Sequence, residues 1–146
     1  MKYVARKTTS DGRYLYLFCF DWSRGYSAEA ACGGPQWFTN KAELKSLARW
    51  VTIHEYRYQD TIKDEVLTYS EYLDERDLKL DKMELLLHES GFETHRIYEE
   101  YNRRLYVYLS DIKYGLPVAQ WIDISLSELA EVEQLVLKSK EGCLDG

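Results

Sequence analysis

The second half of this chain resembles its first half, and this repeat limits the folds that the chain can adopt. Six residues of the first half recur with the same spacing ninety positions later: Arg13, Leu15, Tyr16, Leu17, Phe18 and Asp21 correspond to Arg103, Leu105, Tyr106, Val107, Tyr108 and Asp111. Each copy then runs through a Gln-Trp pair into a helix-capping pattern: Gln36-Trp37 before Asn40-x-x-Glu43, and Gln120-Trp121 before Ser125-x-x-Glu128. Internal similarity defines the building block of a fold. We expect each block to be a β-hairpin, a third strand and a closing helix.

The repeat predicts an α+β fold made of two βββα-like modules. The first module occupies residues 1–58 and the second residues 93–146, and helices in residues 59–92 join them. A chain of 146 residues has the length of one compact domain. The middle segment is not rich in Gly, Ser or Pro, so it does not resemble a flexible linker. We therefore expect the modules to pack as one compact unit.

The first module begins with the strongest local signal. Residues 2–8 and 13–22 are rich in strand-forming residues and flank Ser10-Asp11-Gly12, and Asp-Gly between two such runs predicts a β-hairpin. Residues 26–32 are the predicted third strand. Asn40 and Glu43 form a capping-box pattern at the start of a helix. The apolar face of that helix has a spacing of 3.6 residues: Leu44, Leu47, Ala48 and Val51.

The middle of the chain has a helical pattern. Apolar residues at helical spacing predict one helix over about residues 61–75: Ile62, Val66, Tyr69 and Leu73. Asp81 and Glu84 predict the start of another, which Gly91 would end. The second module then follows with strands at 94–101, 104–111 and 118–123. Ser125 is the expected cap of a last helix, whose apolar stripe contains Leu129, Val132 and Val136.

Strand side chains alternate between the two faces of a sheet. One face of the second strand is aliphatic, with Leu15, Leu17 and Cys19, and the other is aromatic, with Tyr14, Tyr16 and Phe18. The repeat keeps this alternation, since Leu105, Val107 and Leu109 alternate with Tyr106 and Tyr108. We expect the aliphatic faces to contact the helices. The aromatic faces are interpreted in three ways: as core, which is favoured, as a protein-binding surface, or as a platform on which nucleobases stack.

Charge divides the chain unevenly. Residues 1–58 hold nine Lys or Arg and five Asp or Glu, whereas residues 59–146 hold ten and twenty. Such asymmetry bears on the choice of partner. The acidic part would repel phosphate and attract a basic protein surface. Its densest cluster is predicted at an exposed helix–helix junction: Asp74, Glu75, Asp77 and Asp81.

Residues 3–52 resemble the small βββα DNA-binding modules found at the N-termini of tyrosine integrases. The resemblance rests on Asp11-Gly12-Arg13 at a hairpin turn, on residues 38–43 opening a helix, and on Trp50 within that helix. The resemblance implies a sheet that enters the major groove of DNA. However, the second predicted strand, at residues 13–22, is aromatic and aliphatic, whereas integrase sheets carry basic and polar residues. A helical stripe of Lys41, Lys45 and Arg49 would suit a phosphate backbone.

Residues 81–140 have the α-β-β-β-α order of double-stranded RNA-binding domains. Those domains place lysines at the start of their last helix, where they contact phosphates. The matching segment here, residues 125–131, contains no lysine. The resemblance therefore implies the topology without the RNA-binding activity.

No pattern in the chain predicts catalysis, a metal or a cofactor. His54, His88 and His95 lack metal-ligand spacing, and three cysteines far apart (Cys19, Cys32, Cys143) are typical of reduced thiols in the cytoplasm. No apolar run approaches the length of a signal peptide core or a membrane span.

These patterns predict a small non-catalytic cytoplasmic binding protein without a membrane partner. The sharpest version is an inhibitor or adaptor of the phage-accessory type, which docks its acidic surface on a basic nucleic-acid-binding protein or its complex. The predicted contacts are the four acidic residues and the face of Tyr14, Tyr16 and Phe18. Two alternatives stay open: a nucleic-acid-binding protein that uses Lys41, Lys45 and Arg49, and an enzyme whose site is assembled from distant residues. A homodimer that forms through the aromatic faces also stays open.

Overall fold

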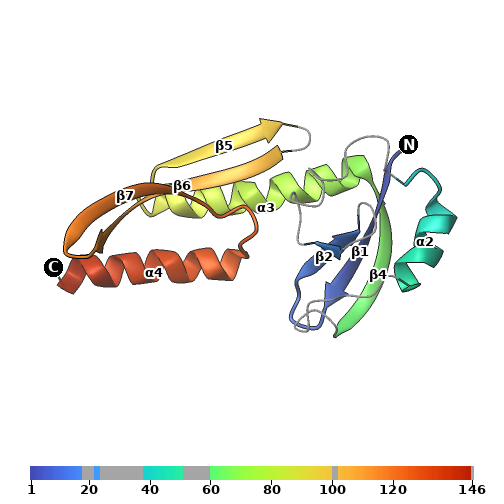
Figure 1. Ribbon diagram of the computed structural model, residues 1–146, viewed down its shortest axis with the longest axis horizontal. Coiled ribbons are helices and arrows are strands. Elements are labelled where there is room, and N and C mark those ends of the chain that lie inside the picture. Colours follow the sequence, from blue (N-terminus) through green and yellow to red (C-terminus); the bar gives the residue numbers. More distant parts are fainter. Residues whose placement is uncertain (18–21, 24–37, 51–59, 100–101, 146) are drawn as a thin grey trace. The chain divides into compact units, whose positions relative to one another are not determined.

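The chain folds into two compact units, Met1–Arg76 and Asp77–Gly146, each with its own antiparallel sheet (Figure 1). The computed structural model describes residues 1–17, 22–23, 38–50, 60–99 and 102–145. Helices and antiparallel sheets occur in both units, which confirms the predicted α+β class.

The sheet of unit 1 has the strand order β3-β2-β1-β4. Its strands are β1 (Tyr3–Thr9), β2 (Tyr14–Leu17), β3 (Trp22–Ser23) and β4 (Thr61–Thr68). β1 and β2 form the hairpin that Asp11-Gly12 predicts, and Gly12 has a φ of 85°, a conformation that costs glycine little. The Thr9 hydroxyl accepts a hydrogen bond from the Arg13 N–H, at 3.0 Å, and so closes the turn.

Helix α2 (Lys41–Trp50) covers one face of this sheet. It begins as predicted, because the Asn40 side-chain oxygen accepts a hydrogen bond from the Glu43 N–H at 3.1 Å. Leu44 and Ala48 of α2 are buried against Ala5 and Leu17 of the sheet. Several features named in the sequence analysis lie outside the described residues. They are the predicted third strand at residues 26–32, the Gln36-Trp37 pair, Cys19, Cys32, Val51 and His54.

The prediction of a helix over residues 61–75 is wrong for its first half. Residues 61–68 form β4, which pairs with β1 along its length, and α3 (Tyr69–Glu89) begins only after it. Thr68 and Glu71 mark the change: the Thr68 hydroxyl accepts from the Glu71 N–H, and the Glu71 carboxylate accepts from the Thr68 N–H, both at 3.2 Å. This is a capping box. It sits at the strand–helix boundary.

The predicted second helix start at Asp81 is also wrong. α3 is a single helix of 21 residues, and Asp81 lies within it. Its C-terminus confirms the prediction for Gly91, which has a φ of 87°. The Phe92 N–H donates to the Leu87 carbonyl at 2.9 Å, a hydrogen bond typical of glycine-ended helices.

Unit 2 contains the predicted α-β-β-β-α order: the end of α3, β5 (Thr94–Glu99), β6 (Asn102–Lys113), β7 (Leu116–Asp123) and α4 (Leu129–Asp145). β6 is the central strand of the sheet. Its Leu105 and Val107 are buried against both helices, and the core contains Leu80, Met83, Leu87, Leu105, Val107, Ile124, Val132 and Val136. Since Leu105 and Val107 share one side of β6, both helices cover that side of the sheet.

Ser125 does not cap the last helix. α4 begins at Leu129, and Ser125 is fully buried before it. The Ser125 hydroxyl accepts a hydrogen bond from the Leu105 N–H at 2.8 Å, so it satisfies the backbone of β6. Ser125 therefore ties the chain that leaves β7 to the central strand.

The internal repeat is not confirmed as a structural repeat. The repeated positions Leu15, Leu17, Leu105 and Val107 are all buried. However, β4 adds a fourth strand to the first sheet, and the three-stranded second sheet has no such strand. The four acidic residues also lie along one helix and not at a helix–helix junction.

Candidate functional site

The side of the second sheet that faces away from α3 and α4 carries a group of aromatic rings. Leu105 and Val107 face the helices, so the alternation along β6 places Tyr106 and Tyr108 on the opposite side. In the strand register, His95 of β5 lies opposite Tyr106, and Trp121 of β7 lies opposite Tyr108. We call these four residues the aromatic face.

The rings of the aromatic face contact one another across all three strands. Tyr108 and Trp121 meet edge to face with their centroids 5.2 Å apart, and His95 lies 6.3 Å from both Tyr106 and Trp121. Tyr108 is 38% exposed and Trp121 is 45% exposed. A cluster of large rings that stays in water is a common mark of an interaction surface. The aromatic face is therefore the main candidate site of unit 2.

Arg104 places a positive charge at one end of the aromatic face. It shares this side of β6 with Tyr106, and its guanidinium donates a hydrogen bond to the Tyr106 hydroxyl at 3.0 Å. This contact orients the Tyr106 ring along the strand. It leaves the Tyr108–Trp121 pair as the open part of the face.

The predicted acidic contacts are partly engaged inside the protein. Asp74 and Asp81 are exposed, whereas Glu75 and Asp77 are half-buried. In unit 1, Glu75 pairs with Arg6 and accepts a hydrogen bond from the Tyr16 hydroxyl at 3.1 Å. Because Glu75 holds Arg6 and Tyr16, it has a structural role within the unit.

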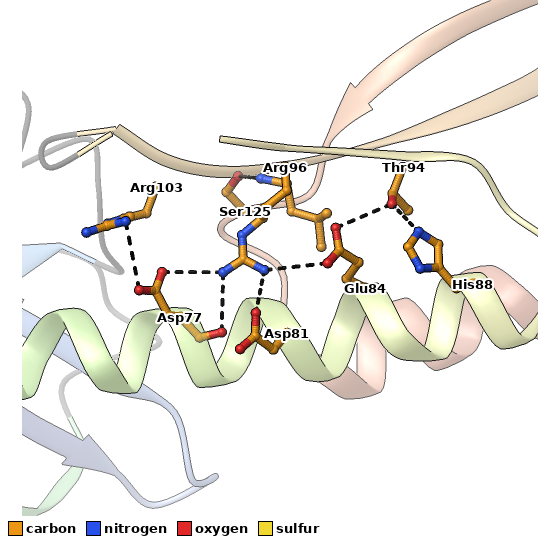
Figure 2. A network of polar contacts seen from close by, with 9 residues as sticks. Asp77, Asp81, Glu84, His88, Thr94, Arg96, Arg103 and Ser125 are labelled. Atoms are coloured by element: carbon orange, nitrogen blue, oxygen red, sulfur yellow. Dashed lines mark hydrogen bonds and ion pairs between the residues drawn. The ribbon is translucent and has the colours of Figure 1, made fainter. Parts of the chain in front are cut away.

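Arg96 gathers the carboxylates of α3 in unit 2, as Figure 2 shows. Its guanidinium lies 2.8 Å from the Asp81 carboxylate and 3.3 Å from that of Asp77, and it also donates to the Asp77 carbonyl. Glu84 lies 4.0 Å away. The Arg96 side chain is only 4% exposed. This network attaches β5 to α3 and offsets part of the negative charge on that helix.

Two other features of Figure 2 continue the attachment along α3. Arg103 of β6 approaches Asp77 at 3.9 Å, and His88 lies 2.6 Å from the Thr94 hydroxyl. His88 thus contacts a strand residue. These contacts attach β5 and β6 to α3 within unit 2, and none of them involves the aromatic face.

The aromatic residues predicted on β2 have different surroundings. Tyr16 is buried, and its ring meets that of Tyr72 from α3 at 4.8 Å. Tyr14 is 42% exposed, and the Arg6 guanidinium lies 4.5 Å from the centre of its ring. Phe18 lies outside the described residues. The core interpretation therefore holds for Tyr16 in unit 1, while Tyr106 and Tyr108 at the repeated positions of unit 2 retain open surface.

Lys41, Lys45 and Arg49 lie on one side of α2, as their spacing predicts. All three are exposed. They line a cleft of about 680 Å³ in unit 1, together with residues 64–67 of β4 and Glu71 and Glu75 of α3. The structure thus places the basic stripe beside a row of carboxylates. That arrangement is less suited to phosphate than a wholly basic groove would be.

Two carboxyl groups of unit 1 have altered acidity. A hydrogen bond from the Thr9 hydroxyl is the main cause that lowers the pKa of Asp11, and Arg13 acts in the same direction. The pKa of Glu65 is lowered from 4.5 chiefly by hydrogen bonds from Lys63 and then from Arg6. Both are effects of neighbouring donors that favour the charged carboxylate.

The lowered pKa of Glu65 predicts a pH dependence of stability. The stabilisation is fully present above pH 4.5 and is lost as the pH falls through the lower pKa of the folded state. Glu65→Gln should therefore lower the free energy of unfolding at pH 7 by about 1 kcal/mol or less, as for an ion pair near the surface. Urea unfolding at pH 7 and pH 3 measures this. A gap between the two proteins that persists unchanged at pH 3 would contradict the assignment.

Sequence reasoning identified half of the aromatic face. The alternation of Leu105 and Val107 with Tyr106 and Tyr108 was sufficient to separate the two sides of β6. His95 and Trp121 were missed, because their place beside these rings depends on the register of β5 and β7. One signal in the sequence could have located Trp121. Side chains alternate along the predicted strand 118–123, so Trp121 lies on the side of the sheet opposite to Ile122.

The described residues show neither a metal-ligand cluster nor a membrane-spanning helix. In the described ranges, no three His, Cys, Asp or Glu side chains are grouped so that they could hold a metal ion. Within the same ranges, no helix is both long and apolar enough to cross a bilayer.

Comparisons of the chain with protein-family models, with curated proteins and with solved structures find no match.

Proposed function

We propose that this chain is a non-catalytic binding protein whose aromatic face holds a basic surface of a partner protein. The observation that carries the proposal is the exposed Tyr108–Trp121 pair on the open side of the second sheet. Tyr and Trp dominate the energetics of many protein interfaces, because they bury a large area at a small cost in side-chain entropy. A rigid sheet holds both rings in place before a partner arrives.

The charge of unit 2 supports a basic partner. This unit contains eight Lys or Arg and fourteen Asp or Glu, whereas unit 1 contains eleven of each. A negative field accelerates encounter with a positive surface and disfavours phosphate. Lys and Arg side chains of the partner can also stack on the Tyr108 and Trp121 rings. Nucleic-acid-binding proteins are one class that carries such surfaces, in agreement with an inhibitor or adaptor role.

The close contact with the partner lies on the second sheet and not on the acidic residues of α3. Asp77 and Asp81 hold Arg96, and Glu75 holds Arg6, so these carboxylates are already engaged within their units. Reversing their charge would disturb the fold along with any docking. Asp74 remains exposed on α3. The acidic residues contribute chiefly through the overall field of the unit, and the rings supply the close contact.

A pair of double variants tests the proposal. Tyr108→Ala/Trp121→Ala should weaken binding of an arginine-rich nonapeptide by about tenfold or more, since two stacking contacts are lost. Leu85→Ala/Leu137→Ala is the matched control, because both leucines are exposed on the helices of unit 2. Isothermal titration calorimetry at low and at physiological salt measures the affinities. Equal peptide affinity of the wild type and both variants would overturn the proposal.

Two further measurements exclude other occupants of the aromatic face. Titration with an oligothymidylate tests base stacking on the same rings. Sedimentation of the wild type and the Tyr108→Ala/Trp121→Ala variant tests a second copy of this chain. Tighter binding of the oligonucleotide than of the peptide, or a dimer that the double variant abolishes, would assign the face to that occupant and overturn the proposal.

A further inference from the structure

The cleft in unit 1 runs along an edge of the first sheet. β4 is the last strand in the order β3-β2-β1-β4, and β1 is its neighbour on the inner side. The cleft is lined by residues 64–67 of β4, with α2 on one side and the first turns of α3 on the other. Figure 1 shows α2 alongside β4 within this unit. Among the strands that the structure describes, β4 is thus an edge strand, and the cleft follows it and reaches Ala5 and Arg6 of β1.

We propose that this edge binds an extended acidic segment of a partner protein, which joins the sheet as a strand beside β4. The backbone N–H and C=O groups on the outer side of an edge strand are available for pairing with another chain. The site belongs to unit 1 and takes a ligand of opposite charge to that of the aromatic face. It is thus independent of the function proposed above.

The carboxylates that line the cleft are engaged by groups of the same unit. Glu65 is bound by Arg6 and Lys63, and Glu75 also pairs with Arg6. Glu71 accepts hydrogen bonds from the backbone and the hydroxyl of Thr68. Asp64 lies 2.8 Å from the Lys7 ammonium group. Asp64, Glu65 and Glu75 are therefore paired with cations of the same unit, whereas Glu71 keeps its negative charge.

The basic residues that line the cleft, which we call the basic wall, are Lys41, Lys45 and Arg49. All three are exposed, and none of them forms an ion pair with another residue in the described ranges. The charge left for a ligand to neutralise is consequently positive. A carboxylate-bearing segment meets that need. A basic segment would meet at close range three cations that have no ion-pair partner among the described residues.

The spacing of the basic wall fits an extended chain. Successive members of the stripe are four residues apart on a helix, which is a rise of about 6.0 Å. Alternate side chains of a strand are about 6.6–6.8 Å apart. In a ligand that runs along α2, acidic residues at every second position can therefore follow Lys41, Lys45 and Arg49 in turn. The ligand side chains between them would face the other side of the sheet edge.

A peptide suits this groove better than a nucleic acid. A polyphosphate chain offers no regular series of backbone donors and acceptors that could pair with β4. The small apolar side chains of Ala48 and Val66 leave room for a chain at the bottom of the groove.

The probe is a fluorescein-labelled peptide of eight residues in which Glu and Val alternate. Fluorescence anisotropy should detect binding by the full chain, and Lys41→Glu/Lys45→Glu/Arg49→Glu should weaken it by about tenfold or more. Lys82→Glu/Lys138→Glu is the control for net charge and is compared with Lys41→Glu/Lys45→Glu, because each double variant changes the net charge by about four and both control lysines are exposed in unit 2. Binding by this control should fall less than threefold. An equal loss in both variants would overturn the proposal.

A second probe tests strand pairing without changing the protein. The same peptide, methylated on alternate backbone nitrogens, keeps its charge but cannot donate along one edge. Its affinity should be about tenfold lower, and the amides of residues 61–68 should exchange more slowly only with the unmodified peptide. Equal affinity of the two peptides would overturn strand addition. Duplex DNA that binds more tightly than the peptide, and that the triple variant fails to bind, would assign the basic wall to phosphate instead.

Discussion

Arg96→Met is expected to lower the free energy of unfolding by about 2–4 kcal/mol. Breaking a buried ion pair by removing one partner costs on the order of 3–5 kcal/mol, and the partial exposure of the carboxylates here reduces that figure. Arg96 is 4% exposed and lies within 3.3 Å of the side chains of both Asp77 and Asp81. Its loss leaves these carboxylates and Glu84 close together, with Arg103, which lies 3.9 Å from Asp77, as the cation that still pairs with them in the described part of the chain. Urea unfolding followed by circular dichroism measures the effect.

Three companion variants separate the ion pairs from simple packing. Arg96→Lys keeps the charge but not the planar fork, so its cost should be intermediate. Lys82→Met removes an exposed cation from α3, the helix that carries the three carboxylates, and should change stability by less than about 0.5 kcal/mol. Adding Asp77→Asn/Asp81→Asn to Arg96→Met should recover part of the loss, since the repulsion is removed. No recovery would show that Arg96 acts through packing alone.

Alternation along the strands was the most reliable guide to this fold. It separated Leu17 from Tyr16 and Val107 from Tyr108, and the structure buries both aliphatic residues. The hairpin at Asp11-Gly12 and the cap at Asn40 were also predictable, because both depend on residues within one turn of each other. Turns and helix caps of this kind depend on a few neighbouring residues, so a short window of sequence is enough to predict them.

β4 was missed because its defining contacts are not local. Ile62, Val66 and Tyr69 fit a helical period, yet residues 61–68 pair with β1, which lies more than fifty positions earlier. An edge strand with charged residues in its middle does not show a clean alternation. The segment contains four β-branched residues, which favour strands: Thr61, Ile62, Val66 and Thr68. The helical spacing of the apolar residues obscured this signal.

The acidic residues of α3 also depend on contacts that are distant in sequence. Asp81 and Glu84 have the spacing of a helix cap, but α3 continues through them and Asp81 binds Arg96 fifteen residues away. Which carboxylates are engaged depends on the register between β5 and α3, and composition does not contain that register. Net charge predicted the sign of the field around unit 2. It could not tell which acidic side chains remain available to a partner.

Leu17→Ala is expected to destabilise unit 1 by about 2–5 kcal/mol, and Val107→Ala to destabilise unit 2 by about 1–4 kcal/mol. Both side chains are completely buried, Leu17 against Leu44 and Ala48 of α2, and Val107 in the core with Val132 and Val136 of α4. Shortening them removes apolar contacts and leaves a cavity, and the two costs add. Leucine loses more atoms than valine, so its effect should be the larger.

Hydrogen exchange of the β1, β2 and β6 amides, together with urea unfolding, measures these losses. Leu116→Ala is the control, because Leu116 is 66% exposed at the start of β7, and it should change stability by less than about 0.5 kcal/mol. The result bears directly on the aromatic face. If Leu17→Ala and Val107→Ala both behaved like the control, the strand faces would be inverted, and Tyr106 and Tyr108 would belong to the core instead of to the binding surface.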